Sequence, residues 1–189
     1  MKIITAPAIE PVTLAEVRET LGFQTGDTGQ DAIITRRITS AREWVEGITH
    51  RALITQTREI RMDTFLSEIK LPSALTITSV KYIDTNGVLQ TVAAGDYVLD
   101  NYSDMAILRT AYSSIWPSPR DELNAVRIQF TAGYGPTAAD VPSLIRETVM
   151  GLVGHWMNFQ PQTQDGRIVA HIPKPLERML DPFVITNYR

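Results

Sequence analysis

Apolar residues recur at helical spacing near both ends of the chain, and they alternate with polar residues in its middle. The helical stretches predict helices over residues 13–21, 31–48 and 141–159. Thr13 and Glu16 stand three positions apart, as in a capping box, and mark where the first of these helices begins. Two stretches of helical pattern therefore enclose a central stretch of β pattern.

The helix predicted over 31–48 is amphipathic. Asp31 is its expected N-cap. One side carries apolar residues at alternating steps of four and three, namely Ile34, Ile38, Ala41, Val45 and Ile48. The opposite side carries charges of both signs, namely Arg36, Arg37, Arg42, Glu43 and Glu46. We expect these charges to form ion pairs within the chain or with neighbouring subunits rather than to contact phosphates, because acidic residues exceed basic ones overall.

The β block is expected over about 53–131. Residues 84–87 (DTNG) form a strong turn signal, so residues 75–83 and 88–92 are predicted to pair as a hairpin. Trp116 lies in the segment 113–119 (SSIWPSP), where prolines at positions 117 and 119 disfavour regular structure. We interpret this tryptophan either as a lid over the sheet or as the anchor of an interface, and the pattern does not decide between them.

The chain after residue 161 is polar and interrupted by prolines, with at most a short helix around residues 175–180. In the preceding helix, Gly151 and Gly154 indicate that another backbone packs closely there. The predicted fold class is α+β, a small α-helical bundle with an inserted antiparallel β block and a C-terminal arm. We expect residues 1–160 to form one domain and residues 161–189 to form the arm.

Composition excludes several classes of protein. The 189 residues include no cysteine, so disulfides, thiolate-ligated metals and a cysteine nucleophile are excluded. A net charge of −3 gives no reason to expect nonspecific binding of duplex DNA by the whole surface. No apolar run approaches the roughly 20 residues of a membrane helix, and the first residues do not resemble a secretory signal. We therefore expect a cytosolic protein with no membrane partner.

Candidate chemistry is sparse. The three histidines, His50, His155 and His171, lack a second ligand at metal-site spacing. The segment 133–136 (GYGP) lacks the spacing of a phosphate loop and is expected to connect a strand to a helix. Six acidic residues of the β block fall mostly at turn positions: Asp63, Glu68, Asp84, Asp96, Asp100 and Asp104. We predict no catalytic residue, no metal and no cofactor.

An ordered series of short segments resembles the head–tail connector (adaptor) family of tailed phages and related gene transfer agents. The resemblance covers roughly residues 10 to 160 and depends on the order of the segments more than on any one of them. The segments are 11–17 (PVTLAEV), 41–46 (AREWVE), 49–57 (THRALITQT), 71–72 (LP), 77–84 (ITSVKYID), 95–97 (GDY), 116–117 (WP), 130–135 (FTAGYG), 141–142 (VP) and 155–156 (HW).

The resemblance implies a structural protein that assembles as a ring, a dodecamer, beneath the portal protein after DNA packaging. Such a ring links the capsid to the tail, contacts a downstream stopper or tail-completion protein, and lets DNA pass only as cargo through its channel. The implied location is the virion, at the head–tail interface, with assembly in the host cytoplasm. A monomeric protein-binding module and an enzyme with an unrecognised site are the alternatives.

Three groups of residues are candidate contacts under this interpretation. The expected subunit interface is Arg36, Arg37, Arg42, Glu43 and Glu46. The expected portal-binding residues lie in the arm and are Ile172, Leu176, Phe183, Tyr188 and Arg189. The expected loop contacts, toward the tail or a neighbouring subunit, are Asn86, Gly87 and Trp116.

Overall fold

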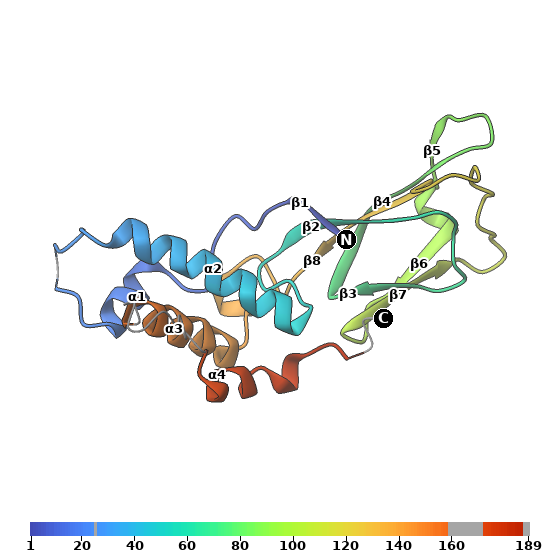
Figure 1. Ribbon diagram of the computed structural model, residues 1–189. Helices are drawn as coiled ribbons and strands as arrows, with labels where there is room; N and C mark the ends of the chain where they lie inside the picture. Colours follow the sequence, from blue (N-terminus) through green and yellow to red (C-terminus); the bar gives the residue numbers. More distant parts are fainter. Residues whose placement is uncertain (25, 159–171, 187–189) are drawn as a thin grey trace, which may run out of the picture. The chain divides into compact units, whose positions relative to one another are not determined.

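A computed structural model describes residues 1–24, 26–158 and 172–186, and its fold class is α+β, as predicted (Figure 1). The described chain divides into two compact units. The helical unit comprises Ile9–Ile54 and Gly135–Val184, and the β unit comprises Met1–Ala8, Thr55–Tyr134 and residues 185–186. The single domain that we expected over residues 1–160 stays a prediction.

Three helices pack on one another in the helical unit: α1 (Leu14–Thr20), α2 (Asp31–Thr49) and α3 (Ser143–Asn158). A short helix, α4 (Lys174–Arg178), follows, and 3-10 turns lie at Ala138–Asp140 and Asp181–Phe183. The ranges predicted for α1, α2 and α3 are confirmed to within two residues, apart from Phe159, which lies outside the described residues. No helix within the described ranges is long and apolar enough to cross a bilayer.

The capping box at the start of α1 is confirmed. The Thr13 hydroxyl accepts a hydrogen bond from the Glu16 amide at 3.2 Å, and the Thr13 amide donates to the Glu16 carboxylate at 2.7 Å. The capping box thereby satisfies two of the backbone amides that have no partner within the helix. At the other end, Leu21 caps the helix and Gly22 adopts a φ of 72°, a left-handed conformation that glycine tolerates.

Two predictions for α2 are wrong. Gln30, not Asp31, is the N-cap, and it makes no side-chain cap bond. Asp31 is the first helical residue, and its carboxylate lies 2.6 Å from Arg18 Nη1 at the end of α1. Ile48, predicted to be on the buried side, is exposed. Thr49 is fully buried instead, and its hydroxyl donates a hydrogen bond to the Val45 carbonyl.

The β unit contains two antiparallel sheets. One has five strands in the order β1-β2-β8-β4-β5, and the other has three in the order β3-β7-β6. The strands are β1 (Lys2–Thr5), β2 (Gln56–Met62), β3 (Ile69–Pro72), β4 (Ala74–Ile83), β5 (Leu89–Thr91), β6 (Tyr97–Asp100), β7 (Met105–Thr110) and β8 (Val126–Ala132). The central strand β8 buries every second residue, from Val126 through Phe130 to Ala132.

The predicted hairpin is confirmed, since β4 pairs with β5 across the 84–87 turn. Along the sequence, Thr55–Tyr134 of the β unit separates the two parts of the helical unit, as expected for an insertion. The sequence pattern missed two strands, β1 and β3. Because β1 precedes the first helix, the β unit is more than a simple insertion.

The arm expected over 161–189 is described only in part. Residues 161–171 and 187–189 lie outside the described residues, but Lys174–Val184 belongs to the helical unit. Leu180 is fully buried, and Arg51 Nε donates a hydrogen bond to the Phe183 carbonyl at 2.5 Å. The short helix expected near residues 175–180 is confirmed as α4.

The two glycines of α3 are explained by side chains rather than by a neighbouring backbone. A Cβ added to Gly151 would lie 2.9 Å from Leu176 Cδ2 of α4. One added to Gly154 would lie 3.3 Å from Leu21 Cδ2, just past α1. Small residues in α3 therefore make room for leucines from the segments on either side.

Candidate functional site

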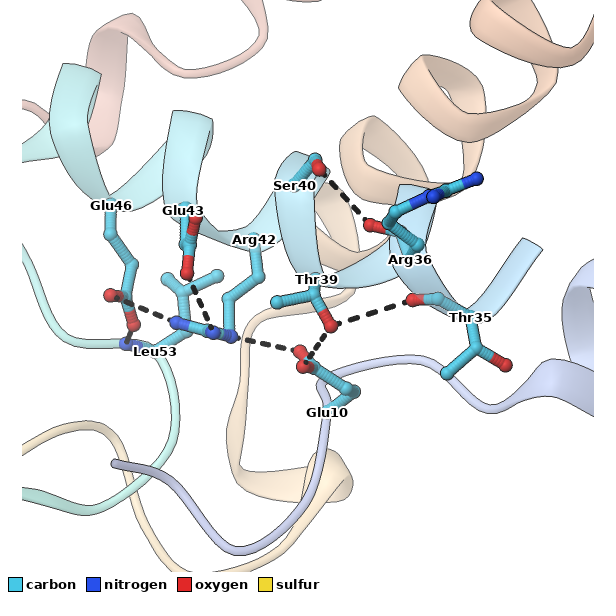
Figure 2. Close-up of polar contacts among 9 residues, drawn as sticks. All are labelled: Glu10, Thr35, Arg36, Thr39, Ser40, Arg42, Glu43, Glu46 and Leu53. Carbon is cyan, nitrogen blue, oxygen red and sulfur yellow. Dashed lines mark hydrogen bonds and ion pairs between the residues drawn. The ribbon is translucent and has the colours of Figure 1, made fainter. Parts of the chain in front are cut away.

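Three acidic residues of the helical unit surround Arg42 of α2, which is only 5% exposed (Figure 2). Its Nε lies 2.8 Å from a carboxylate oxygen of Glu10, in the segment before α1. Its Nη1 lies 3.3 Å from Glu46 Oε2, one helical turn further along. Its Nη2 lies 3.6 Å from Glu43, whose side chain is 65% exposed. Arg42 thus holds a preceding loop against α2.

The carboxylates around Arg42 are themselves tied to the chain. Glu46 Oε1 accepts a hydrogen bond from the Leu53 amide at 2.9 Å, and Glu10 Oε1 accepts one from the Thr39 hydroxyl at 2.8 Å (Figure 2). Buried charges persist when they are both paired and hydrogen-bonded, and this network meets that condition. The network therefore connects three segments of one chain: the segment before α1, helix α2 and the segment after α2.

The expectation that five charges share the outer side of α2 is therefore wrong for Arg42 and Glu46. Arg42 lies four residues after Ile38 and Glu46 directly follows Val45, so both flank the buried stripe at about 100° per residue. The predicted ion pairs of Arg42 with Glu43 and Glu46 are present.

Arg36 and Glu43 are exposed and Arg37 is half-buried. The guanidinium of Arg36 points away from the Arg42 network in Figure 2, while the Arg36 carbonyl accepts a hydrogen bond from the Ser40 hydroxyl. Across residues 1–24, 26–158 and 172–186, neither Arg36 nor Arg37 has an ion-pair partner. These two arginines remain available for a contact outside the chain.

In the β unit, Trp116 stacks on Phe65 with ring centroids 4.6 Å apart and planes 6° apart. Tyr97 lies near the tryptophan at 6.5 Å, and Tyr82 meets Phe65 edge-on at 6.0 Å. Burial raises the pKa of Tyr97. These contacts support the interpretation of Trp116 as a lid, while a role in an interface stays a prediction.

The hairpin turn is ordered by Asp84. Its carboxylate accepts hydrogen bonds from the Gln90 side chain and from the amides of Asn86 and Val88, all at 2.9 Å. These bonds, the Gln90 bond first, lower the pKa of Asp84. Gly87 has a φ of 83°, which the turn requires. Asn86 and Gly87 are exposed at this tip.

Of the expected portal-binding residues, Ile172, Leu176 and Phe183 are half-buried, and Tyr188 and Arg189 lie outside the described residues. The exposed side of α4 forms an open hollow lined by Lys174, Pro175, Arg178 and Met179.

Two residues that organise the helical unit were missed in the sequence. Glu10 reaches Arg42 from 32 residues away, and Arg146 of α3 binds Glu16 of α1 from 130 residues away. No local pattern signals such pairs, because each depends on the tertiary arrangement. Among the described residues, no three His, Asp or Glu side chains lie close enough together to hold a metal ion.

The fold and these surfaces define a two-unit α+β protein in which buried charges join segments of the chain. No known protein family matches the sequence, and no curated protein matches it.

Solved structures match along the whole chain. Three of them have TM-scores of 0.80, 0.79 and 0.75 at 21%, 22% and 22% identity, and all three cover 100% of this chain. They are chains in structures of the neck of an empty GTA particle computed with C6 symmetry, of the virion of a native gene transfer agent (GTA) particle, and of the neck of a native GTA particle computed with C12 symmetry. The match covers 98%, 96% and 98% of those chains, so this protein has their fold over its full length.

Proposed function

We propose that this protein is a head–tail connector (adaptor), a structural, non-catalytic part of a virion neck. The observation that carries the proposal is the full-length fold match to chains from gene transfer agent particles and their necks. Because fold alone does not define function, the ordered sequence segments that resemble connectors provide a second, separate argument. The protein then resides in the virion at the head–tail interface, after assembly in the host cytoplasm.

The proposed assembly is a ring of identical subunits, a dodecamer. Two of the matching structures were computed with C6 and C12 symmetry, which fits a ring of twelve copies. A closed ring requires two different surfaces on each subunit that fit each other. Exposed Arg36 and Glu43 and half-buried Arg37 of α2 are candidates for one of them, whereas Arg42 and Glu46 would act there only by holding α2 in place.

In this assembly DNA passes through the channel as cargo. The net charge of −3 agrees with a conduit, because a strongly basic lumen would bind passing phosphates.

The two ends of the ring would face different partners. We assign the portal side to the C-terminal segment, with Ile172, Leu176, Phe183, Tyr188 and Arg189 as the contacts. We assign the side facing a downstream stopper or tail-completion protein to the hairpin tip at Asn86 and Gly87 and to the Trp116 loop.

The direct test is negative-stain imaging of the purified protein mixed with purified portal. We expect added ring-shaped density at the narrow end of the portal, and a portal that stays bare at saturating protein would contradict the proposal. Deleting 187–189 tests the last two portal contacts and leaves buried Leu180 in place. This deletion should reduce portal occupancy, whereas Lys70→Glu, at an exposed position on β3, should leave it unchanged.

A further inference from the structure

One exposed face of the helical unit is basic. Arg36 is exposed on α2, Arg37 follows it, and neither has an ion-pair partner in the described part of the chain. Ile33, one turn earlier on α2, exposes 40% of its surface. This face, defined as Ile33, Arg36 and Arg37, combines an apolar side chain with two uncompensated positive charges.

A second exposed face of the same unit is acidic. Glu19 of α1 and Glu147 of α3 are both exposed and, within the described ranges, have no ion-pair partner. Glu19 lies one turn after Glu16, and Glu147 directly follows Arg146, so the two flank the ion pair that joins α1 to α3. Leu144, one turn before Glu147, is 39% exposed. This second face is therefore an acidic counterpart of the first.

The two faces lie on opposite sides of the helical unit. The buried side of α2 packs against both α1 and α3, so the exposed side of α2 points away from them. The acidic face is built from the outer sides of α1 and α3, around the contact between those two helices. Two different patches on opposite sides are what head-to-tail association around a closed axis requires.

We propose that the basic face of α2 in one copy contacts the acidic α1–α3 face of the next copy around the ring. This inference rests on the proposed ring assembly and names the two surfaces that form each subunit contact. Opposite charges at such a contact favour the correct orientation of the two copies, and like charges placed there oppose their association. The contact should therefore weaken as ionic strength rises.

Paired charge reversals test the contact. In R36E/R37E both faces are acidic, and in E19R/E147R both faces are basic, so neither variant alone should form rings on the portal. We expect ring occupancy to fall at least tenfold for each. A 1:1 mixture should restore it, because alternating copies again place opposite charges across every contact. The control K2E/K70E changes the net charge as much as R36E/R37E does, at exposed positions in the β unit, and should form rings normally.

A cysteine pair tests the same contact without the portal. The natural chain has no cysteine, so R36C/E147C introduces one thiol on each face. Mild oxidation at high protein concentration should give a ladder of disulfide-linked oligomers, whereas each single variant should stop at dimers. Circular dichroism of every variant verifies that the helical unit is folded.

The outcomes separate this contact from its alternatives. Loss of rings in R36E/R37E without rescue by E19R/E147R would overturn the contact and indicate that the arginines contact the portal instead. Unchanged rings in both variants, or the absence of both rings and a ladder, would also overturn it. A ladder of disulfide-linked oligomers without any attachment to the portal would leave the contact standing and refute the proposed function.

Discussion

Arg146 of α3 binds the same carboxylate that caps α1, that of Glu16. Its Nη2 donates to Glu16 Oε1, and its Nε donates to the Pro11 carbonyl at 2.9 Å. The other Glu16 oxygen accepts hydrogen bonds from the amide and hydroxyl of Thr13 at 2.7 and 2.8 Å. One side chain therefore both begins a helix and attaches it to a helix 130 positions away in sequence.

This arrangement predicts a dependence of stability on pH. The Thr13 backbone N–H first, and then the Thr13 hydroxyl and Arg146, hold the pKa of Glu16 below its ordinary value of 4.5. A group with a lowered folded-state pKa stabilises the fold above its unfolded pKa, and the contribution is lost as pH falls through the folded value. We expect Glu16→Gln to lower the free energy of unfolding at pH 7 and to change it little at pH 3.

Urea denaturation of both proteins between pH 3 and pH 7 measures this difference. Glu19→Gln, on the exposed side of the same helix, is the control and should follow the wild type at every pH. A constant gap between wild type and Glu16→Gln across the range would contradict the role assigned to Glu16.

Removing the buried arginine of α2 should be strongly destabilising. Arg42→Met leaves the Glu10 and Glu46 carboxylates without their shared cation, and breaking a buried pair in this way costs about 3 kcal/mol. The mostly exposed third partner provides the control, because Glu43→Gln should cost less than about 0.5 kcal/mol. Equal losses for the two variants, measured by urea denaturation, would show that burial of Arg42 has no special effect.

Replacing two helical glycines with alanine should have different effects on the free energy of unfolding. A Cβ at Gly47 of α2 meets nothing within 4 Å, so Gly47→Ala should raise the free energy of unfolding by about 1 kcal/mol. At Gly151 the same change meets Leu176, and the gain should disappear because that leucine must move. The double variant Gly151→Ala/Leu176→Ala should have a higher free energy of unfolding than Leu176→Ala alone, because the obstructing leucine is then absent. If Gly151→Ala alone is as stabilising as Gly47→Ala, the packing of α4 on α3 does not exist in solution.

The stacked pair in the β unit should show energetic coupling. A double-mutant cycle on Phe65→Ala and Trp116→Ala should give an interaction of about 0.5–1.5 kcal/mol, the range for aromatic pairs. Tyr112 lies four residues before Trp116 but is fully exposed, so a cycle of Tyr112→Ala with Trp116→Ala should give about zero. Similar values for both cycles would mean that Trp116 does not act as a lid on Phe65.

The parts of the fold that the sequence predicted are those that local rules determine. The capping box of Thr13 and Glu16, the helical period and the turn at Asp84 each act within a few residues. Strands β1 and β3 have four residues each and, unlike β5, no turn signal that pairs them with the next strand, and they gain regular structure by pairing with distant strands.

The errors in α2 arise from choices that local rules leave open. After Val45 the apolar stripe could continue at position 48 or 49, and the buried position is Thr49 because its hydroxyl bonds back to the Val45 carbonyl. The burial of Arg42 depended on Glu10, which no periodic pattern connects with α2. Exposed Arg36 and half-buried Arg37 followed the simple amphipathic pattern more closely.

The chain enters and leaves each unit more than once, and this sets the order in which the protein is completed during translation. Strand β1 leaves the ribosome before β2 and has no partner until β2, more than fifty residues later, has been made. Helices α1 and α2 wait longer for α3, because all eight described strands of the β unit are synthesised before it. Nascent α1 and α2 therefore keep their apolar sides uncovered while the β unit is made, and that interval is when this chain is most exposed to aggregation.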